Sequence, residues 1–321
     1  MSELRFDGRV AIVTGAGRGI GRAEALLLAE RGASVLVNDL GSSTAGDGAS
    51  SEPAEQVVAE IVAAGGTAVA SLSTIATPDG AQEIVELALE RFGRIDALVN
   101  NAGIVDHGEF PEITAADVQK QLDVHLLGYF NVTRAAWPHL AKRGSGRVVM
   151  TTSVAGLYGM PTQVGYGSAK AGAFGMMRCL ACLGTDAGIM VNAVAPGAYT
   201  RMVDNVGDAD FRAFSAANRT AEAVAPIVAV LAHESCAVTG EVFTAASGRV
   251  ARTFIAETRG YFGTDHRPED LLDNWEAVVA EDGYVLPASA GDNVRLAMAR
   301  LREAGIAAPE LTLPEFSRAQ Q

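Results

Sequence analysis

Short apolar runs alternate with amphipathic stretches along most of the chain. The runs lie at residues 10–13, 34–37, 67–72, 95–99, 146–151, 190–194 and 240–244. Continuous apolar runs of this kind are typical of strands that are buried on both faces of a sheet. The stretches between them carry apolar residues at helical spacing. The alternation therefore predicts an α/β fold with a single doubly wound parallel sheet and helices on both faces.

Glycines, prolines and capping residues mark where the helices begin and end. We expect helices from Gly21 to a stop at Gly32, from Pro53 to a stop at Gly65, and over residues 79–92, 114–142, 166–186 and 226–233. Pro138 predicts a kink near the end of the long helix. Residues 41–51 predict an exposed loop, and residues 199–219 predict a loop-rich segment because they show no clear periodicity.

The pattern changes after Gly248. Helical spacing returns at residues 268–280 and 289–304, and Ser289 is suited to cap the second of these helices. No linker separates this part from the rest. We therefore predict one domain over residues 1–248 and, over residues 249–321, an extension that packs on that domain without a core of its own.

Composition and charge narrow the class of protein. The 321 residues are 49% hydrophobic and 20% charged, which is enough for a buried core. A net charge of −13 argues against binding to nucleic acid or to anionic membranes. No apolar run reaches the length of about 18 residues that a membrane span needs. We expect no signal peptide and no peroxisomal address at the C-terminus, and a cytoplasmic location.

Three cysteines predict no disulfide framework. Cys179 and Cys182 form a C-x-x-C pair within a predicted helix. No second cysteine pair or histidine cluster completes a zinc site. We therefore expect buried structural thiols and no bound metal.

Tyr166 and Lys170 are candidates for acid–base chemistry. They are four residues apart, which places both side chains on one face of a helix. A lysine ammonium stabilises a nearby phenolate, so the tyrosine can exchange a proton near neutral pH. The hydroxyl of Ser153 could hold a carbonyl or alcohol oxygen beside it. Taken alone, the pair favours two solvated side chains over chemistry, and the rest of the chain has to decide.

A glycine-rich turn follows the first strand and opens the first helix. The glycine spacing of this turn lets the backbone approach a pyrophosphate at the N-terminus of the helix. The residues expected to contact the cofactor here are Gly15, Arg18, Gly19, Ile20 and Gly21. Asp39 ends the second strand, where a carboxylate accepts hydrogen bonds from ribose hydroxyls and repels a 2′-phosphate. This favours NAD over NADP, although the basic Arg18 is a contrary sign.

Further motifs follow in a fixed order. Asn100-Asn101-Ala102-Gly103 comes after the fourth strand, and Pro196-Gly197 comes after the sixth. With Ser153, Tyr166 and Lys170 between them, the chain resembles the short-chain dehydrogenase/reductase family. The strings at 38–41, 124–126, 153–159 and 233–236 resemble one subgroup, the (3R)-hydroxyacyl-CoA dehydrogenase unit of peroxisomal multifunctional enzyme type 2, also called 17β-hydroxysteroid dehydrogenase type 4. The likeness covers residues 6–305.

The resemblance implies a Rossmann-like domain with about seven strands. It implies that Tyr166 is the acid/base, that Lys170 binds the nicotinamide ribose and tunes Tyr166, and that Ser153 orients the substrate oxygen. The cofactor would also contact Asn101, Ala102 and Gly103 on its adenosine side and Pro196 and Gly197 on its nicotinamide side. Tyr158, Tyr199 and Met202 would line the substrate. A homodimer or homotetramer through the helices that start near Thr114 and Gln163 is also implied.

The chain departs from the family pattern at three positions. His125 stands where most members have an asparagine, and we expect either a packing residue or a proton-relay residue there. Ser73 replaces an aspartate that often contacts adenine. Thr200, expected to hold the nicotinamide carboxamide, comes one position early.

Three functions remain open at this point. The first is NAD-dependent oxidation of (3R)-3-hydroxyacyl-CoA to 3-oxoacyl-CoA in β-oxidation, including that of steroid side chains. The second is oxidation of free steroids by a 17β-hydroxysteroid dehydrogenase. The third is a catalytically silent dinucleotide-binding protein, against which the intact Ser153, Tyr166 and Lys170 argue.

Overall fold

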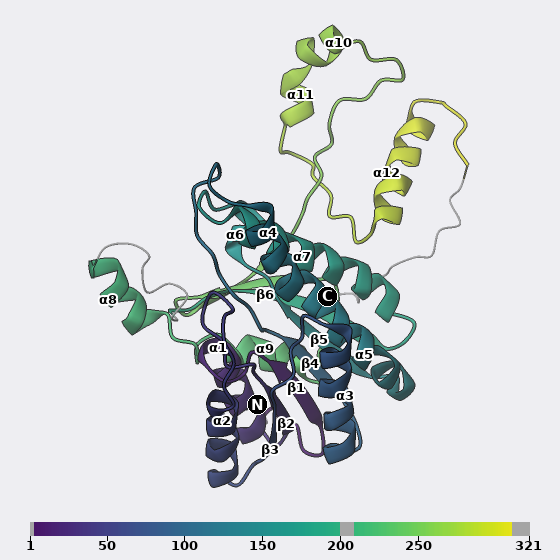
Figure 1. Cartoon of the computed structure of the whole chain (residues 1–321). Coiled ribbons are helices and arrows are strands. Elements are labelled where there is room, and N and C mark those ends of the chain that lie inside the picture. The colour runs from purple at the N-terminus through teal and green to yellow at the C-terminus, as the bar shows by residue number, and fades with distance from the viewer. Residues whose placement is uncertain (1–2, 200–208, 310–321) are drawn as a thin grey trace. The chain divides into compact units, whose positions relative to one another are not determined.

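One mostly parallel sheet organises the first part of the chain. The computed structural model describes residues 3–199 and 209–309 (Figure 1). The sheet has eight strands in the order β3-β2-β1-β4-β5-β6-β7-β8. The strands are β1 (Val10–Thr14), β2 (Ser34–Asn38), β3 (Thr67–Ser71), β4 (Ala97–Asn100), β5 (Gly146–Thr151), β6 (Ile189–Gly197), β7 (Val242–Ala246) and β8 (Arg249–Thr253). The predicted doubly wound α/β fold is confirmed.

Strand order reverses at β1, which pairs in parallel with both β2 and β4. Because the two crossover connections leave β1 in opposite directions, a crevice opens at the carboxyl ends of β1 and β4. Parallel pairing continues from β4 through β7. The fold therefore gathers the segments that follow β1, β4, β5 and β6 at one edge of the sheet.

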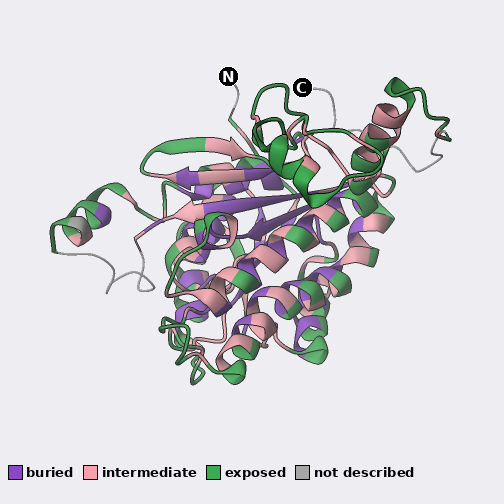
Figure 2. Cartoon of the chain, turned by 90° about the horizontal axis from the view of Figure 1, so that it is seen from above, coloured by how far each residue is buried: buried purple, intermediate pink, exposed green. Residues whose placement is uncertain are grey.

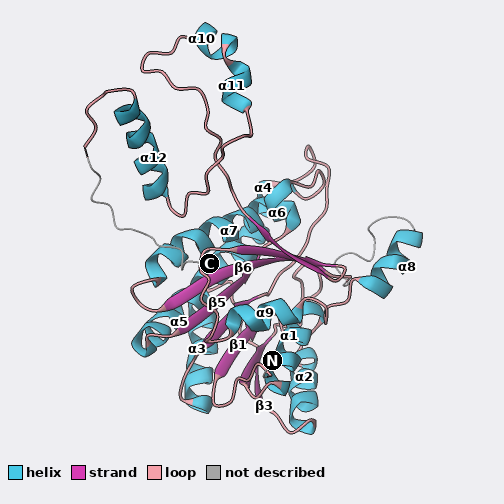
Figure 3. Cartoon of the chain, turned by 180° about the vertical axis from the view of Figure 1, so that it is seen from behind, coloured by secondary structure: helices cyan, strands magenta, loops and turns pink. Residues whose placement is uncertain are grey.

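Helices cover both faces of the sheet (Figure 3). One face carries α1 (Gly19–Glu30), α2 (Glu52–Ala63) and α9 (Ala225–Ala232). The other carries α3 (Pro78–Phe92), α4 (Ala115–Leu122), the π-helix η1 (Asp123–Gly128), α5 (Tyr129–Arg143) and α7 (Val164–Gly184). The short helix α6 (Val154–Tyr158) precedes α7, and α8 (Ala209–Asn218) precedes α9. None of the helices in the described ranges is long and apolar enough to cross a membrane.

The core lies between the sheet and its two helical layers. Every residue of β1 and of β5 is buried, as expected for strands covered on both faces. Figure 2 shows the inner strands of the sheet mostly in the buried colour and the outer faces of the helices exposed. Aliphatic side chains of β1, β2 and α1 pack with those of α9 in one cluster.

Several sequence predictions were wrong in detail. Residues 209–218, predicted as loop, form α8, because the segment contains good helix formers although little of it is buried. β8 was not predicted; it follows β7 after a two-residue turn at Ser247 (φ 50°) and Gly248 (φ 76°), the conformation that closes a tight hairpin. Cys179 and Cys182 are exposed rather than buried, because Met177 and Ala181 are the residues of α7 that face inward.

The chain divides into two compact units, residues 1–252 and 253–321. The second unit contains α10 (Pro268–Asp273), α11 (Trp275–Val279) and α12 (Ala290–Glu303). Ser289 caps α12 as predicted, accepting a hydrogen bond from the Asp292 N–H (3.2 Å). None of its described residues, 253–309, is buried, so this part has no core of its own. That it packs on the first unit stays a prediction.

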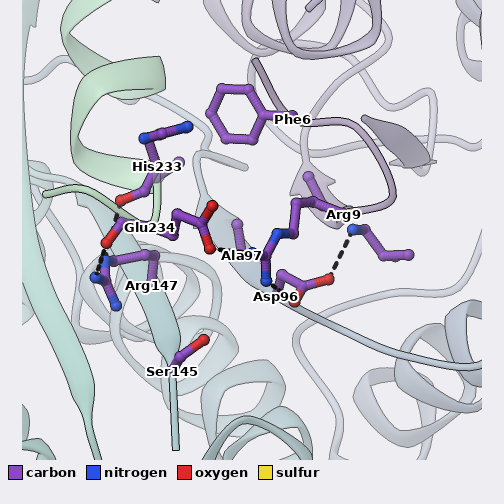
Figure 4. A pocket seen from close by; sticks show the side chains of 11 residues that line it. Phe6, Arg9, Asp96, Ala97, Ser145, Arg147, His233 and Glu234 are labelled. Carbon is purple, nitrogen blue, oxygen red and sulfur yellow. Dashed lines mark hydrogen bonds and ion pairs between the residues drawn. The ribbon is translucent and has the colours of Figure 1, made fainter. Parts of the chain in front are cut away.

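A network of charges ties the amino ends of the strands together (Figure 4). The buried Asp96 accepts a hydrogen bond from the Val10 N–H (2.9 Å) and forms ion pairs with Arg9, Arg94 and Arg143. The adjoining cavity has a volume of about 10 Å³, which is room for one water molecule. The ion pairs of Asp96 therefore form a structural clamp at this edge of the sheet.

Candidate active site

The glycine-rich turn lies against the segment that follows β4. Gly15 (φ 65°) and Gly19 (φ 55°) adopt left-handed backbone conformations that other residues rarely take. A Cβ on Gly15 would lie 2.5 Å from the Cα of Ala102, and one on Gly21 would collide with the side-chain amide of Asn101. Glycine is thus required here for two backbone segments to approach each other.

Asn101 and Ala102 fix the turn from the other side. The Asn101 side-chain amide donates to the carbonyls of Thr14 (3.0 Å) and Gly15 (3.1 Å). The N–H groups of Asn101 and Ala102 donate to the Thr14 hydroxyl, at 3.1 and 3.2 Å. These predicted cofactor residues therefore hold the predicted phosphate-binding turn in place.

The first turn of α1 is open for an anion. Its N-cap residue, Arg18, makes no side-chain cap, and the first turn contains no acidic residue. Uncapped N–H groups at a helix N-terminus bind phosphate oxygens, and the helix dipole favours the negative charge. Together with the glycine turn, this arrangement fits the pyrophosphate of a dinucleotide.

Asp39 is anchored beside the same turn. One carboxylate oxygen accepts the Gly17 N–H (2.8 Å), and the other accepts the Gly41 N–H (2.7 Å). Each carboxylate oxygen has a second lone pair, so the group can still accept hydrogen bonds from ribose hydroxyls. A Cβ on Gly17 would lie 2.8 Å from the Asp39 carboxylate, which shows how closely the carboxylate and the turn are packed.

Ser153 and Tyr166 lie together after β5. Ser153 is the N-cap residue of α6, and its hydroxyl accepts the Ala155 N–H (3.1 Å). Burial raises the pKa of Tyr166, and a hydrogen bond from Ser153 acts in the opposite direction. The pair therefore presents a neutral phenol and a hydroxyl to one point, where an alcohol or carbonyl oxygen could be held.

Lys170 is buried behind Tyr166, one turn further along α7. Only 2% of it is exposed, and burial lowers its pKa to about 7. Its ammonium donates to the Thr151 carbonyl (2.7 Å) and to the phenol oxygen of Tyr129 (3.0 Å). The Nζ atom lies 5.9 Å from the centre of the Tyr166 ring. The predicted tuning of Tyr166 by Lys170 is therefore geometrically possible.

His125 lies in the π-helix η1 and faces Tyr166. The two rings meet edge to face, with their centres 5.2 Å apart. His125 is fully buried, and its Nε2 lies 2.7 Å from the Ile104 carbonyl oxygen and 3.2 Å from the Ile104 backbone nitrogen, so it can meet this backbone segment as a donor or as an acceptor. Burial and then the charge of Lys170 hold its pKa well below the usual range. His125 is therefore neutral, and its Nδ1 has no hydrogen-bond partner within the described ranges.

Tyr129 and Glu24 were missed by the sequence analysis. Tyr129 is fully buried four residues after His125, and a tyrosine one turn from a candidate residue was the available signal. Glu24 lies on the buried face of α1, where helical periodicity would have placed it. Neither residue belongs to a motif, so motif reading passed over both.

The remaining predicted site residues are less closely grouped. Pro196 and Gly197 end β6 and pair with Ala245 and Ala246 of β7. Tyr158, at the end of α6, is 67% exposed. The backbone N–H of Tyr199 donates to the Arg219 carbonyl (2.5 Å). Thr200 and Met202 lie outside the described residues.

Comparison with known proteins agrees with this geometry. A sequence model of the short chain dehydrogenase family matches residues 9–210. The chain is 43% identical to the peroxisomal multifunctional enzyme type 2 of Mus musculus over 281 residues, which is 86% of this chain and 37% of that enzyme. It is 40% identical to a 3-oxoacyl-[acyl-carrier-protein] reductase of Synechocystis over 247 residues, covering 75% of this chain and 97% of the reductase.

A solved structure extends the comparison to the fold. The full-length peroxisomal multifunctional enzyme type 2 of Drosophila melanogaster superposes with a TM-score of 0.78 at 31% identity. The match covers 94% of this chain and 50% of the fly chain. This chain thus spans about a third of the mouse enzyme and half of the fly structure. The predicted resemblance to this subgroup is confirmed.

Proposed function

The chain belongs to the short chain dehydrogenase family, and from this premise we propose that it oxidises (3R)-3-hydroxyacyl-CoA to 3-oxoacyl-CoA with NAD. The observation that carries the reaction type is the meeting of Ser153, Tyr166 and Lys170 at the carboxyl end of β5. The substrate class rests on the likeness to peroxisomal multifunctional enzymes type 2.

The chemistry divides between the cofactor and the chain. A bound nicotinamide cofactor supplies the acceptor for the hydride that leaves the carbinol carbon. The Ser153 hydroxyl holds the substrate oxygen, and the Tyr166 phenolate takes the hydroxyl proton. Lys170, charged below pH about 7, stabilises that phenolate across 5.9 Å. Because the Tyr166 phenolate has to form while Lys170 is still charged, oxidation should speed up as the pH rises toward about 7 and gain little above it.

Asp39 supports NAD as the cofactor. Its carboxylate is fixed by the N–H groups of Gly17 and Gly41 and cannot easily turn away. A 2′-phosphate beside it would meet a fixed negative charge. Replacing it in Asp39→Ser should raise kcat/KM for NADP relative to NAD; an unchanged ratio of the two would contradict this assignment.

Reduction is the second candidate function. The observation that favours it is the 40% identity to a 3-oxoacyl-[acyl-carrier-protein] reductase over 75% of this chain. The same residues run in the reverse direction, with Tyr166 donating the proton to the forming alkoxide. A 17β-hydroxysteroid dehydrogenase on free steroids would use them in the same way and differ only in the bound alcohol.

A substrate panel separates these possibilities. The panel contains both enantiomers of a 3-hydroxyacyl-CoA, a steroid-side-chain thioester, oestradiol and a 3-oxoacyl substrate, each with NAD(H) and NADP(H). We expect the highest kcat/KM for the 3R thioester with NAD. Tyr166→Phe is the control for the chemistry and should abolish turnover. Higher efficiency on oestradiol, or on the 3-oxoacyl substrate with NADPH, would overturn the proposal.

Location and assembly complete the proposal. We expect the protein to work in the cytoplasm and to form a homodimer or homotetramer through the helices that begin near Thr114 and Gln163. Light scattering of the purified chain tests the second expectation, which a monomer at assay concentration would contradict.

A further inference from the structure

The Tyr129 phenol joins the groups around Lys170. Its oxygen accepts a hydrogen bond from the Lys170 ammonium (3.0 Å) and donates to the Ala102 carbonyl (3.0 Å). Ala102 lies in the segment that packs on the glycine-rich turn. A phenol that accepts on one side and donates on the other has a fixed orientation. Tyr129 therefore connects the buried ammonium to the backbone of the predicted cofactor site.

Tyr129 directly follows the π-helix η1, and a π-helical turn is uncommon and often marks a functional site. His125 and Tyr129 are four residues apart, which places both side chains on one face of the helix. Both are fully buried, and their ring centres are 6.4 Å apart. This face therefore brings two aromatic side chains to the same pair, Tyr166 and Lys170.

Lys170 needs such a partner. An ammonium has three N–H donors, and two of them are used by the Thr151 carbonyl and the Tyr129 oxygen. Within the described ranges, no carboxylate forms an ion pair with Lys170. The charged form therefore depends on neutral acceptors, and each acceptor matters more because the site excludes water.

We propose that Tyr129 is a positioning residue that holds the Lys170 ammonium, in its charged form, beside Tyr166. This rests on the proposed function only for its effect on rate. Tyr129 itself stays a neutral phenol, because burial and then the nearby Tyr166 and Glu24 raise its pKa well above the usual range. It does not exchange the reacting proton. It fixes the position and the charge of the group that stabilises the base.

A purely structural role for Tyr129 is the competing explanation. In that case the ring fills space in the core, and its hydroxyl is merely satisfied by the Ala102 carbonyl. Tyr129→Phe separates the two, because it keeps the ring and removes only the hydroxyl. The loss of an acceptor lowers the proton affinity of Lys170, whereas a space-filling role predicts no change in it.

The lysine content makes a direct measurement possible. The chain has three lysines, Lys120, Lys142 and Lys170, so lysine labelled with ¹³C at the ε-carbon gives three NMR signals. Lys170→Met identifies the third signal by its disappearance. The pH midpoint of that signal should lie near 7 in the unaltered protein. In Tyr129→Phe it should fall by about one pH unit, while the other two signals stay in place.

Control variants decide between the outcomes. Tyr284→Phe removes the hydroxyl of an exposed tyrosine of the second unit and should leave all three midpoints unchanged. Thermal melting reports whether Tyr129→Phe is folded; should it fail to fold, Tyr129→Met offers a second side chain without the hydroxyl. An unchanged Lys170 midpoint in a folded variant would overturn the proposal.

The kinetic measurement distinguishes this proposal from the proposed function. In Tyr129→Phe, kcat/KM for alcohol oxidation at neutral pH should fall about tenfold, and its pH profile should shift. No turnover by the unaltered protein on any substrate of the panel would contradict the proposed function and leave the NMR result to decide the role of Tyr129. Normal turnover by the unaltered protein, together with a Lys170 signal that does not move in Tyr129→Phe, would support the proposed function and contradict the proposed role of Tyr129.

Discussion

Glu24 should make the stability of this protein strongly dependent on pH. It lies on the inner face of α1 and is 1% exposed. Neither of its carboxylate oxygens has a hydrogen-bond partner in the part of the chain that the structure describes. Burial raises its pKa from 4.5 to about 8. A carboxyl without a partner is held in its neutral form, because ionising it in an apolar site is costly.

The difference between the pKa of Glu24 in the folded and unfolded states fixes the sign and the size of its effect on the free energy of unfolding. Between pH 4.5 and about 8 the folded state keeps a proton that the unfolded state releases. The free energy of unfolding therefore decreases as the pH rises, by about 1.4 kcal/mol per pH unit. Below pH 4.5 the group is protonated in both states and costs nothing. Above pH about 8 the loss is complete and amounts to about 5 kcal/mol.

Glu24→Gln isolates this contribution. Glutamine resembles the protonated acid in shape and polarity but does not titrate. Urea unfolding of both proteins from pH 5 to pH 9 should show the variant gaining on the unaltered protein by about 1.4 kcal/mol per pH unit up to pH about 8. Glu30→Gln, an exposed glutamate of the same helix, serves as the control and should give no such trend. Parallel stability curves for Glu24→Gln and the unaltered protein would refute the reasoning.

Three further predictions concern charge and packing. Lys170→Met removes a positive charge 5.9 Å from the Tyr166 ring, which at an effective dielectric constant of about 20 is worth about 2.8 kcal/mol. The rate of oxidation at neutral pH should fall about 100-fold and recover in part at high pH; equal losses at every pH in steady-state assays would argue against the charge. Gly21→Ala should abolish cofactor binding measured by calorimetry and lower the free energy of unfolding by about 1–3 kcal/mol, because the added Cβ collides with the Asn101 side-chain amide. Tight cofactor binding by this variant would contradict the role of the turn. Asp96→Asn should cost about 1.5–3 kcal/mol in urea unfolding, since a neutral amide replaces the buried carboxylate that pairs with the half-buried Arg9 and Arg94 and with the exposed Arg143, yet keep the activity of the folded fraction; a neutral effect on stability would show that the clamp contributes little.

The sheet could be predicted because its strands carry their own signal. The run at Val10 is apolar without interruption, the run at Gly146 is interrupted only by Arg147, and the structure buries every residue of both strands. The glycine turn was equally readable, because steric demands at Gly15 and Gly21 leave little alternative to glycine. By contrast, β8 alternates arginine with apolar residues and is only partly buried, so hydrophobicity gave no reason to expect it.

The environment of Lys170 could not be predicted. Its contact with Tyr129 joins residues 41 positions apart, which no local pattern reports. Glu24 illustrates a second limit, since helical periodicity places it on the buried face of α1 whereas a glutamate on a helix is ordinarily exposed. What periodicity cannot supply is the tertiary partner of a polar residue, and here those partners decide the protonation states.

The two edges of the sheet handle buried charge in opposite ways. At the amino edge, Asp96 forms ion pairs with Arg9, Arg94 and Arg143, and this cluster of opposite charges holds the strands together. At the carboxyl edge, His125 and Lys170 are buried without a counter-charge in the described ranges, so burial moves their pKa values toward or below neutrality. Groups that titrate within the working pH range can exchange protons, whereas fully paired ions cannot. Substitutions at Asp96 should therefore change stability and leave the pH dependence of the rate alone, whereas substitutions around Lys170 should change the pH dependence of the rate.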